Sequence, residues 1–109
     1  MDGSLLIKIE FYVPESHLES VKAAMFGAGA GKVGAYESCA WQTLGQGQFR
    51  PIEGSSPFIG EVNTLEKVIE YKVEMVCEQT LVDAVVAAMK KHHPYEEVAY
   101  FLFDGLAAL

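Results

Sequence analysis

The segment from His92 to Glu97 carries the side chains best suited to hold a metal ion. It combines imidazole nitrogens with carboxylate oxygens, and both are ligands for transition metals. The alternative is structural, because basic residues favour the end of a helix and Pro94 would terminate it. Pro94 also disfavours helical geometry at His93, so His93 and Glu97 would not share a helix face. We retain His93, Glu96 and Glu97 as candidate ligands for a divalent ion and expect no other cofactor.

A second group of residues mixes aromatic, amide and guanidinium side chains along a glycine-rich stretch. A small-molecule site needs apolar walls with a few polar groups. The same residue types anchor contacts between subunits. Because a stretch rich in glycine is expected to form an exposed arm, we favour subunit contacts, and a cleft shared between subunits would serve both roles. The candidate ligand or interface residues are Trp41, Gln42, Phe49, Arg50 and Phe58.

Other features that resemble reactive sites have simpler explanations. The glycines from Gly27 to Gly31 follow a predicted helix, whose C-terminal carbonyl groups would repel phosphate, so they indicate a helix exit. Cys39 and Cys77 have no base at a characteristic spacing and are typical of small buried hydrophobes. No serine elbow or carboxylate pair for acid–base chemistry is present. We therefore expect no catalytic activity from this sequence.

The elements that must position these side chains occur twice along the chain. When the sequence is displaced so that Lys8 meets Lys72, the same displacement aligns several other residues. These are Glu10 with Glu74, Ala23-Ala24-Met25 with Ala87-Ala88-Met89, and Ala35-Tyr36 with Ala99-Tyr100. A constant displacement across many residues indicates two related strand–helix–strand units.

Each unit has the same hydrophobic pattern. Apolar residues alternate from Ile7 to Val13 and from Tyr71 to Cys77, which predicts strands with one buried face. Apolar residues at helical spacing follow each strand, and closing strands are expected at Val33–Thr43 and Val98–Phe103. Two such units related by a pseudo-two-fold axis predict an α+β fold. It is the ferredoxin-like βαββαβ arrangement, with an antiparallel sheet and both helices on one face.

The symmetry also predicts how the two units meet. Their first strands should be antiparallel neighbours, with Ile9 beside Val73 at the axis. Lys8 would then face Glu74, and Glu10 would face Lys72, on the open face of the sheet.

The range Leu44–Leu65 has no counterpart in the other unit. Its glycines and prolines predict repeated turns, and loops of this length are usually functional or carry structure of their own. We expect a protruding hairpin or arm between the second and third strands.

Size and charge limit the classes of function. A chain of 109 residues predicts one domain over residues 1–109, and 50% hydrophobic residues argue against disorder. The net charge of −7 argues against nucleic acid and anionic membranes as partners. Two cysteines fit a reduced compartment, and neither a signal peptide nor a membrane-spanning run is evident. The expected location is the cytoplasm.

Several motifs together resemble one family. They are Trp41-Gln42-Thr43 followed by Gly45, Gly47, Phe49 and Pro51, then Pro57-Phe58-Ile59-Gly60, and His93-Pro94-Tyr95-Glu96-Glu97. They resemble the insert domain of Nif-three-like proteins, relatives of the GTP cyclohydrolase type 2 homologues, which also occurs as a free-standing protein. The ending from His93 to Glu96 is similar to CutA. The resemblance implies a CutA/PII-like fold and a homo-oligomer, with a trimer favoured by analogy. It does not imply hydrolase chemistry, because the family's two-metal site lies in flanking halves that this sequence lacks.

Three functions are consistent with these observations. The leading hypothesis is a non-catalytic, oligomeric regulatory or small-ligand-binding module. The first alternative is a divalent metal-binding protein of CutA-like role, using His93 with Glu96 or Glu97. The second is an accessory part of a Nif-three-like metal hydrolase that acts with a partner chain.

Overall fold

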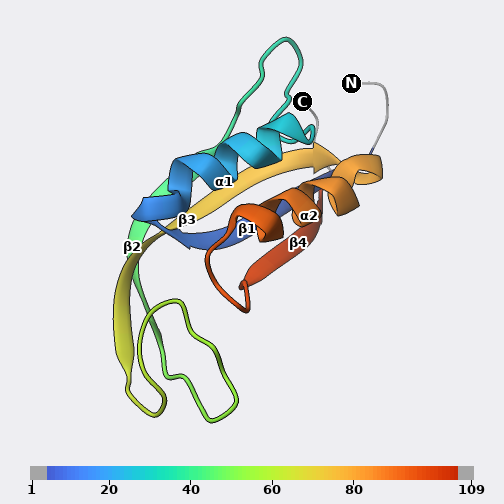
Figure 1. The fold of residues 1–109 in the computed structure, drawn as a ribbon. Coiled ribbons are helices and arrows are strands. Elements are labelled where there is room, and N and C mark those ends of the chain that lie inside the picture. Colours follow the sequence, from blue (N-terminus) through green and yellow to red (C-terminus); the bar gives the residue numbers. More distant parts are fainter. Residues whose placement is uncertain (1–4, 106–109) are drawn as a thin grey trace.

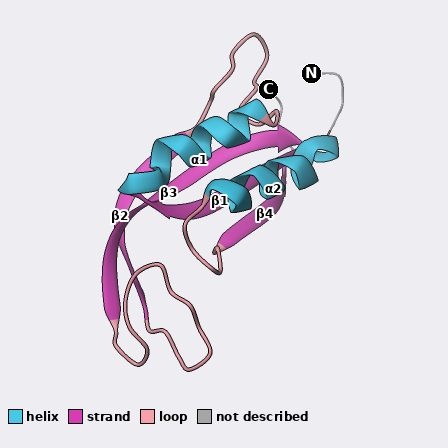
Figure 2. Cartoon of the chain, in the orientation of Figure 1, coloured by secondary structure: helices cyan, strands magenta, loops and turns pink. Residues whose placement is uncertain are grey.

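Two helices cover one face of a four-stranded antiparallel sheet in the computed structural model, which describes residues 5–105 (Figures 1 and 2). The elements in chain order are β1 (Leu6–Pro14), α1 (Glu15–Gly27), β2 (Trp41–Phe49), β3 (Glu66–Glu78), a 3₁₀ turn (Gln79–Leu81), α2 (Val82–His92) and β4 (Tyr100–Gly105). The strand order is β2-β3-β1-β4. This is the predicted ferredoxin-like βαββαβ topology. Neither helix in residues 5–105 is long and apolar enough to cross a membrane.

The core lies between the sheet and the helix layer. Ile9, Phe11 and Val13 of β1 point into it and are fully buried, as the alternating pattern predicts. Apolar side chains of both helices close it from above, including Met25 of α1 and Met89 of α2. Burial of this apolar surface is the main force that holds the helices on the sheet.

The central strands are antiparallel neighbours as predicted, but their register differs from the expected one. Ile9 pairs with Met75 instead of Val73, and Val73 pairs with Phe11. The predicted Ile9–Val73 pair is therefore wrong. A slip of two residues leaves every side chain on its own face of the sheet, so alternation alone does not distinguish the two registers.

The predicted ion pairs across these strands nevertheless form. The Lys8 ammonium lies 2.6 Å from the Glu74 carboxylate, and the Lys72 ammonium lies 3.7 Å from that of Glu10. In the observed register each pair is diagonal. Glu10 and Glu74, which are equivalent residues of the two units, are directly opposite each other.

The first predicted closing strand is largely wrong. Val33 forms only an isolated bridge with Tyr36, and β2 begins at Trp41. Positive φ angles at Gly34 (56°) and Ser38 (58°) turn the backbone away from the extended conformation. The sequence match of Tyr36 with Tyr100 is thus not a structural equivalence. The second prediction, Val98–Phe103, is close to the observed β4.

The expected protruding hairpin is present. β2 and β3 continue past the helices as a two-stranded arm that ends at the pair Phe49–Glu66 (Figure 1). The arm contributes to an elongated molecule of 49 × 24 × 22 Å. Residues 50–65, the arm loop, do not project freely. They return towards the start of α1 and the segment after α2, where Phe58 contacts His17 and Tyr95.

Candidate functional site

A cavity of about 530 Å³ opens where the arm loop folds back towards the segment between α2 and β4. Its walls come from four separate parts of the chain. They are Tyr12 near the end of β1, the outer half of the β2–β3 arm, the arm loop, and the segment from Tyr95 to Ala99. Such a volume is in the range of small-molecule sites.

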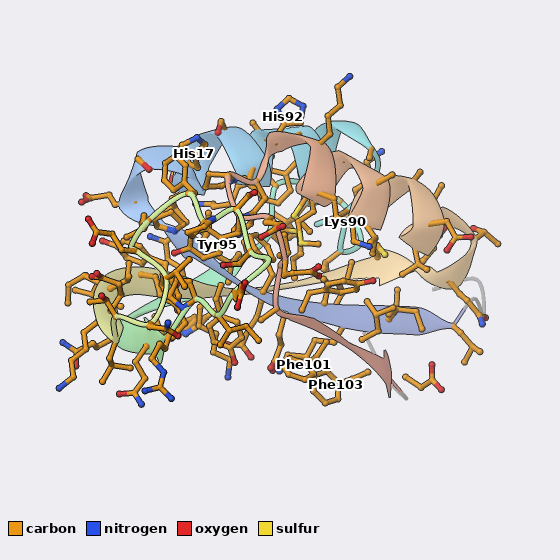
Figure 3. The ribbon with its side chains drawn as sticks, turned by 60° about the horizontal axis from the view of Figure 1, so that its bottom comes forward. His17, Lys90, His92, Tyr95, Phe101 and Phe103 are labelled. Carbon is orange, nitrogen blue, oxygen red and sulfur yellow. The ribbon has the colours of Figure 1, made fainter. Side chains whose placement is uncertain are left out.

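Aromatic rings form much of the cavity wall, with Tyr95 among them. The ring centroid of Tyr95 lies 6.5 Å from that of Phe49 and 6.4 Å from that of Phe58. Phe58 in turn makes an edge contact with the imidazole of His17, at 5.5 Å between centroids. Tyr95 and His17 lie on the same side of the molecule in Figure 3. These contacts hold the arm loop against the domain.

Glu70 of β3 presents a partly buried carboxylate to the cavity. Its Oε2 accepts a hydrogen bond of 3.2 Å from the Tyr95 hydroxyl. The pKa of Glu70 is raised, because burial, which raises it, outweighs the hydrogen bond from Tyr95, which lowers it. Burial and the nearby Glu70 charge raise the pKa of Tyr95 to about 12. The tyrosine therefore stays protonated and donates to the carboxylate at neutral pH.

Gly47 of β2 makes room for this carboxylate. A Cβ atom at Gly47 would collide with Oε1 of Glu70. A Cβ atom at Gly45, on the same strand, would meet no atom within 4 Å. The absence of a side chain at residue 47 thus allows Glu70 to reach Tyr95.

The segment after α2 also fastens the arm loop. Oε2 of Glu96 accepts a hydrogen bond of 2.9 Å from the backbone N–H of Ser56. The next residue, Glu97, lines the same cavity, and its carboxylate forms no hydrogen bond or ion pair with residues 5–105. Arg50 contributes the guanidinium group in the wall.

His93 anchors this segment to the end of β1. It is 7% exposed, and its Nε2 lies 2.6 Å from the backbone oxygen of Tyr12. Its Nδ1 accepts a hydrogen bond of 3.1 Å from the backbone N–H of Tyr95. Because Nδ1 accepts, Nε2 must carry the proton and donate to Tyr12. Burial lowers the pKa of His93, which favours this neutral form.

The candidate metal ligands are close in sequence but engaged differently. Glu96 and Glu97 line the cavity, whereas His93 does not line it and has both ring nitrogens hydrogen-bonded. Within residues 5–105, no three His, Cys, Asp or Glu side chains are grouped so that they could hold a metal ion. Metal binding through His93 would break one of its hydrogen bonds. The metal site stays a prediction.

The structure divides the candidate ligand or interface residues into two sets. Phe49, Arg50 and Phe58 line the cavity. Trp41 and Gln42 lie at the other end of β2 and do not. Trp41 is 68% exposed, and its Nε1–H donates a hydrogen bond to the Thr43 hydroxyl, while Gln42 accepts a hydrogen bond from Lys22 of α1.

Sequence reasoning missed Tyr12, Glu70 and Tyr95 as cavity residues. Tyr95 belongs to a motif with recognisable residues, so its aromatic ring offered a signal. Tyr12 and Glu70 are polar residues in strands of alternating apolar and polar residues, and nothing in the sequence marked them as cavity residues. They join the site because the arm loop folds over them.

The open face of the sheet carries a second feature. Phe101 and Phe103 of β4 project from the side away from the helices (Figure 3). They are 53% and 47% exposed, and their ring centroids are 6.5 Å apart. The exposed Trp41 lies on the opposite edge strand. Exposed aromatic groups of this kind are common in contacts between proteins.

The two cysteines differ. Cys77 is buried in the core as predicted, and burial raises the pKa of its thiol, which makes it unreactive. Cys39 was expected to be buried but is only partly covered. It lies in the turn-rich segment before β2 instead of on a strand.

Comparisons with known proteins agree on the fold. No protein-family model matches the chain. The chain is 48% identical over 98 residues to a GTP cyclohydrolase 1 type 2 homolog of Bacillus subtilis, and the match covers 90% of the chain but 26% of that protein. The structure of a Bacillus cereus protein related to NIF3 superposes with a TM-score of 0.83 at 36% identity, over 95% of this chain and 26% of that one.

More distant structures share the fold alone. CutA from Synechococcus elongatus has a TM-score of 0.66 at 15% identity and matches 96% of this chain and 80% of its own. The Bacillus subtilis GlnK–ATP complex has a TM-score of 0.62 at 14% identity, over 92% of this chain and 81% of that one. The chain thus spans about a quarter of the length of the curated relatives it matches, and it has a CutA/PII-like fold.

Proposed function

Because the chain is homologous to a domain-sized segment of the Nif-three-like proteins, the GTP cyclohydrolase 1 type 2 homologues, we propose that it is a non-catalytic regulatory module that binds a small ligand. The observation that supports this best is the cavity of about 530 Å³ beside Tyr95. The proposed location is the cytoplasm.

The cavity has the composition of a ligand site. Aromatic rings provide apolar walls, and Arg50 and Glu70 add charged groups that would fix the orientation of a ligand. Its outer wall is the arm loop, which is attached to the domain by the Glu96–Ser56 hydrogen bond and by Phe58. A ligand that contacts both the arm loop and the domain would stabilise the arm loop in its observed position. Binding would in this way be communicated to another protein surface.

Homo-oligomerisation is the second part of the proposal. The exposed Phe101, Phe103 and Trp41 on the open face favour assembly with other copies, and we expect a trimer by analogy with CutA. Light scattering on dilute protein tests this part. A monomer at micromolar concentration would contradict it.

Action alongside a Nif-three-like metal hydrolase is the second candidate function. The close relatives carry this domain within chains about four times as long, so the module would act on the remainder of such a protein, either in the same chain or as a partner. Divalent metal binding at His93 is less favoured, because both of its ring nitrogens already have hydrogen-bond partners.

The direct test of the ligand-binding role is a screen of a metabolite library by NMR. We expect at least one compound to shift the amide signals of Tyr95, Ser56 and Ala99 saturably. The control is Phe58→Ala, which removes a cavity wall and should weaken that response. Signals that move only at Trp41 and Phe103, or not at all across the library, would contradict the cavity as the ligand site.

A further inference from the structure

Resting on this proposed function, we propose that the cavity beside Tyr95 binds a small organic cation, such as a quaternary ammonium group or a protonated amine. The arrangement that supports it is a set of aromatic rings and carboxylates without ion-pair partners in residues 5–105, around one partly open cavity.

The rings provide the first part of the site. Phe49 and Phe58 flank Tyr95 at centroid distances of 6.5 and 6.4 Å, and all three line the cavity. The negative face of an aromatic ring attracts a cation within about 6 Å, and rings that approach from several directions bind quaternary ammonium groups. Uncharged apolar ligands would also fit these walls, so the class of ligand depends on the charged side chains of the cavity.

The charges favour a cation. Three carboxylates line the cavity, those of Glu70, Glu96 and Glu97, against the single guanidinium of Arg50. The ion pairs within residues 5–105 involve the lysines at positions 8, 22 and 72, and none of the three cavity carboxylates takes part. The cavity therefore has an excess of negative charge that a bound cation would neutralise.

Glu70 is the carboxylate placed to contact the ligand. One of its oxygens accepts a hydrogen bond from the Tyr95 hydroxyl, and the other lies beside Gly47 with no hydrogen bond to any of residues 5–105. The hydrogen bond from Tyr95 keeps the carboxylate in one position next to the aromatic wall. One oxygen of Glu96 accepts the hydrogen bond from the Ser56 N–H, so the main role of Glu96 is to hold the arm loop in place.

The volume favours an organic ligand over a bare metal ion. About 530 Å³ bounded largely by apolar side chains is much larger than an ion needs, and aromatic rings supply no ligand atoms. An anionic ligand would have to overcome three carboxylates to reach Arg50. An organic cation uses both the rings and the excess charge.

The test uses three probes of similar branched shape and different charge. Tetramethylammonium is the cation, tert-butanol the uncharged counterpart and pivalate the anion. Each is titrated into the full chain at constant ionic strength while the NMR signals of Tyr95, Phe58 and Ala99 are followed. We expect tetramethylammonium to bind saturably and about tenfold more tightly than tert-butanol, and pivalate not to shift these signals.

Two variants and a control make the result specific. Glu70→Gln keeps the shape of the side chain and should weaken tetramethylammonium binding about tenfold without changing tert-butanol binding. Phe58→Leu should weaken tetramethylammonium binding selectively, because it removes an aromatic ring but keeps an apolar wall. The control is Glu53→Gln in the arm loop, which removes the same charge outside the cavity lining and should bind as the parent does.

The outcomes separate this inference from the proposed function. Equal binding of tert-butanol or pivalate would overturn the cation class and leave the cavity as a ligand site. Absence of shifts with all three probes would overturn the inference, and the metabolite screen would then decide the ligand-binding role independently. A loss of tetramethylammonium binding in Glu53→Gln equal to that in Glu70→Gln would also overturn it, because net charge alone would then explain the effect.

Discussion

Glu10 and Glu74 are directly opposite each other on β1 and β3, and the Lys8 ammonium lies 3.1 Å from the first carboxylate and 2.6 Å from the second. Two facing carboxylates would repel each other without this cation. Hydrogen bonding to Lys8 lowers the pKa of Glu74, and the two carboxylates raise the pKa of Lys8. The symmetry axis of the two repeated units passes through this pair.

The first prediction concerns the Lys8 bridge and pH. Because the pKa of Glu74 in the folded state lies below its usual 4.5, its contribution to stability is present above that value and is lost as the pH falls through the lowered pKa. Lys8→Met should therefore destabilise the protein near neutral pH and make little difference at about pH 2. Urea unfolding at several pH values measures this.

The matched control for Lys8 is Lys67→Met. Lys67 lies on the same strand, β3, as Glu74 and forms no ion pair within residues 5–105. Lys67→Met should change the free energy of unfolding by less than about 0.5 kcal/mol. An equal loss in both variants at neutral pH would show that the bridge has no specific effect.

The second prediction concerns His93. Its pKa in the folded state lies below 6.5, so the folded protein resists protonation there, and stability should decrease as the pH falls from about 6.5 through the lowered pKa. His93→Gln should remove this part of the pH dependence. It should also cost about 1–3 kcal/mol at neutral pH, because the Tyr12 carbonyl and the Tyr95 N–H lose well-placed partners.

The neighbouring His92→Gln provides the control, since His92 is exposed at the end of α2. Thermal unfolding of both variants at neutral and mildly acidic pH gives the comparison. If His92→Gln and His93→Gln showed the same pH dependence, the anchoring role of His93 would be incorrect.

The third prediction concerns the space at Gly47. Gly47→Ala should displace the Glu70 carboxylate and break its hydrogen bond with Tyr95, because the added Cβ collides with that carboxylate. The pKa of Tyr95 should then fall from about 12 towards its usual 10.0, to an extent limited by burial, which is the larger cause of the shift. A titration followed by NMR of the Tyr95 ring carbon reports it.

Gly45→Ala introduces the same methyl group into open space on the same strand and should leave the pKa of Tyr95 unchanged. The cost of Gly47→Ala in stability should be small, because the displaced atom is at the end of a flexible side chain. An unaltered Tyr95 titration in Gly47→Ala would disprove the steric role of Gly47.

The fourth prediction concerns the fastening of the arm loop. Glu96→Ala removes the acceptor for the Ser56 N–H and should speed hydrogen exchange of that amide about fivefold, which corresponds to about 1 kcal/mol. Glu97→Ala removes an adjacent carboxylate that accepts no such bond and should leave this exchange rate unchanged. Native-state exchange measured by NMR distinguishes them. Identical Ser56 exchange in the parent and in Glu96→Ala would exclude the fastening role.

Local patterns in the sequence were enough to predict the architecture. Alternating apolar residues such as Ile9 and Phe11 predict which face of each strand is buried, and helical spacing places Met25 and Met89 on the covering side. These are short-range periodicities, so they can be recognised without knowing which element each strand or helix packs against. The repeat of the two units then favours one topology and the correct central pairing of β1 with β3.

The strand register and the cavity could not be predicted from the sequence, because both depend on long-range packing. Shifting β1 against β3 by two residues keeps every face, so only packing of the whole sheet selects the pair Ile9–Met75. The cavity unites Tyr12, Glu70 and Tyr95, which are far apart in sequence and have no shared pattern. They meet because a long loop folds back on its own domain, and contacts of that kind depend on the path of the chain in space, which local sequence periodicity does not encode.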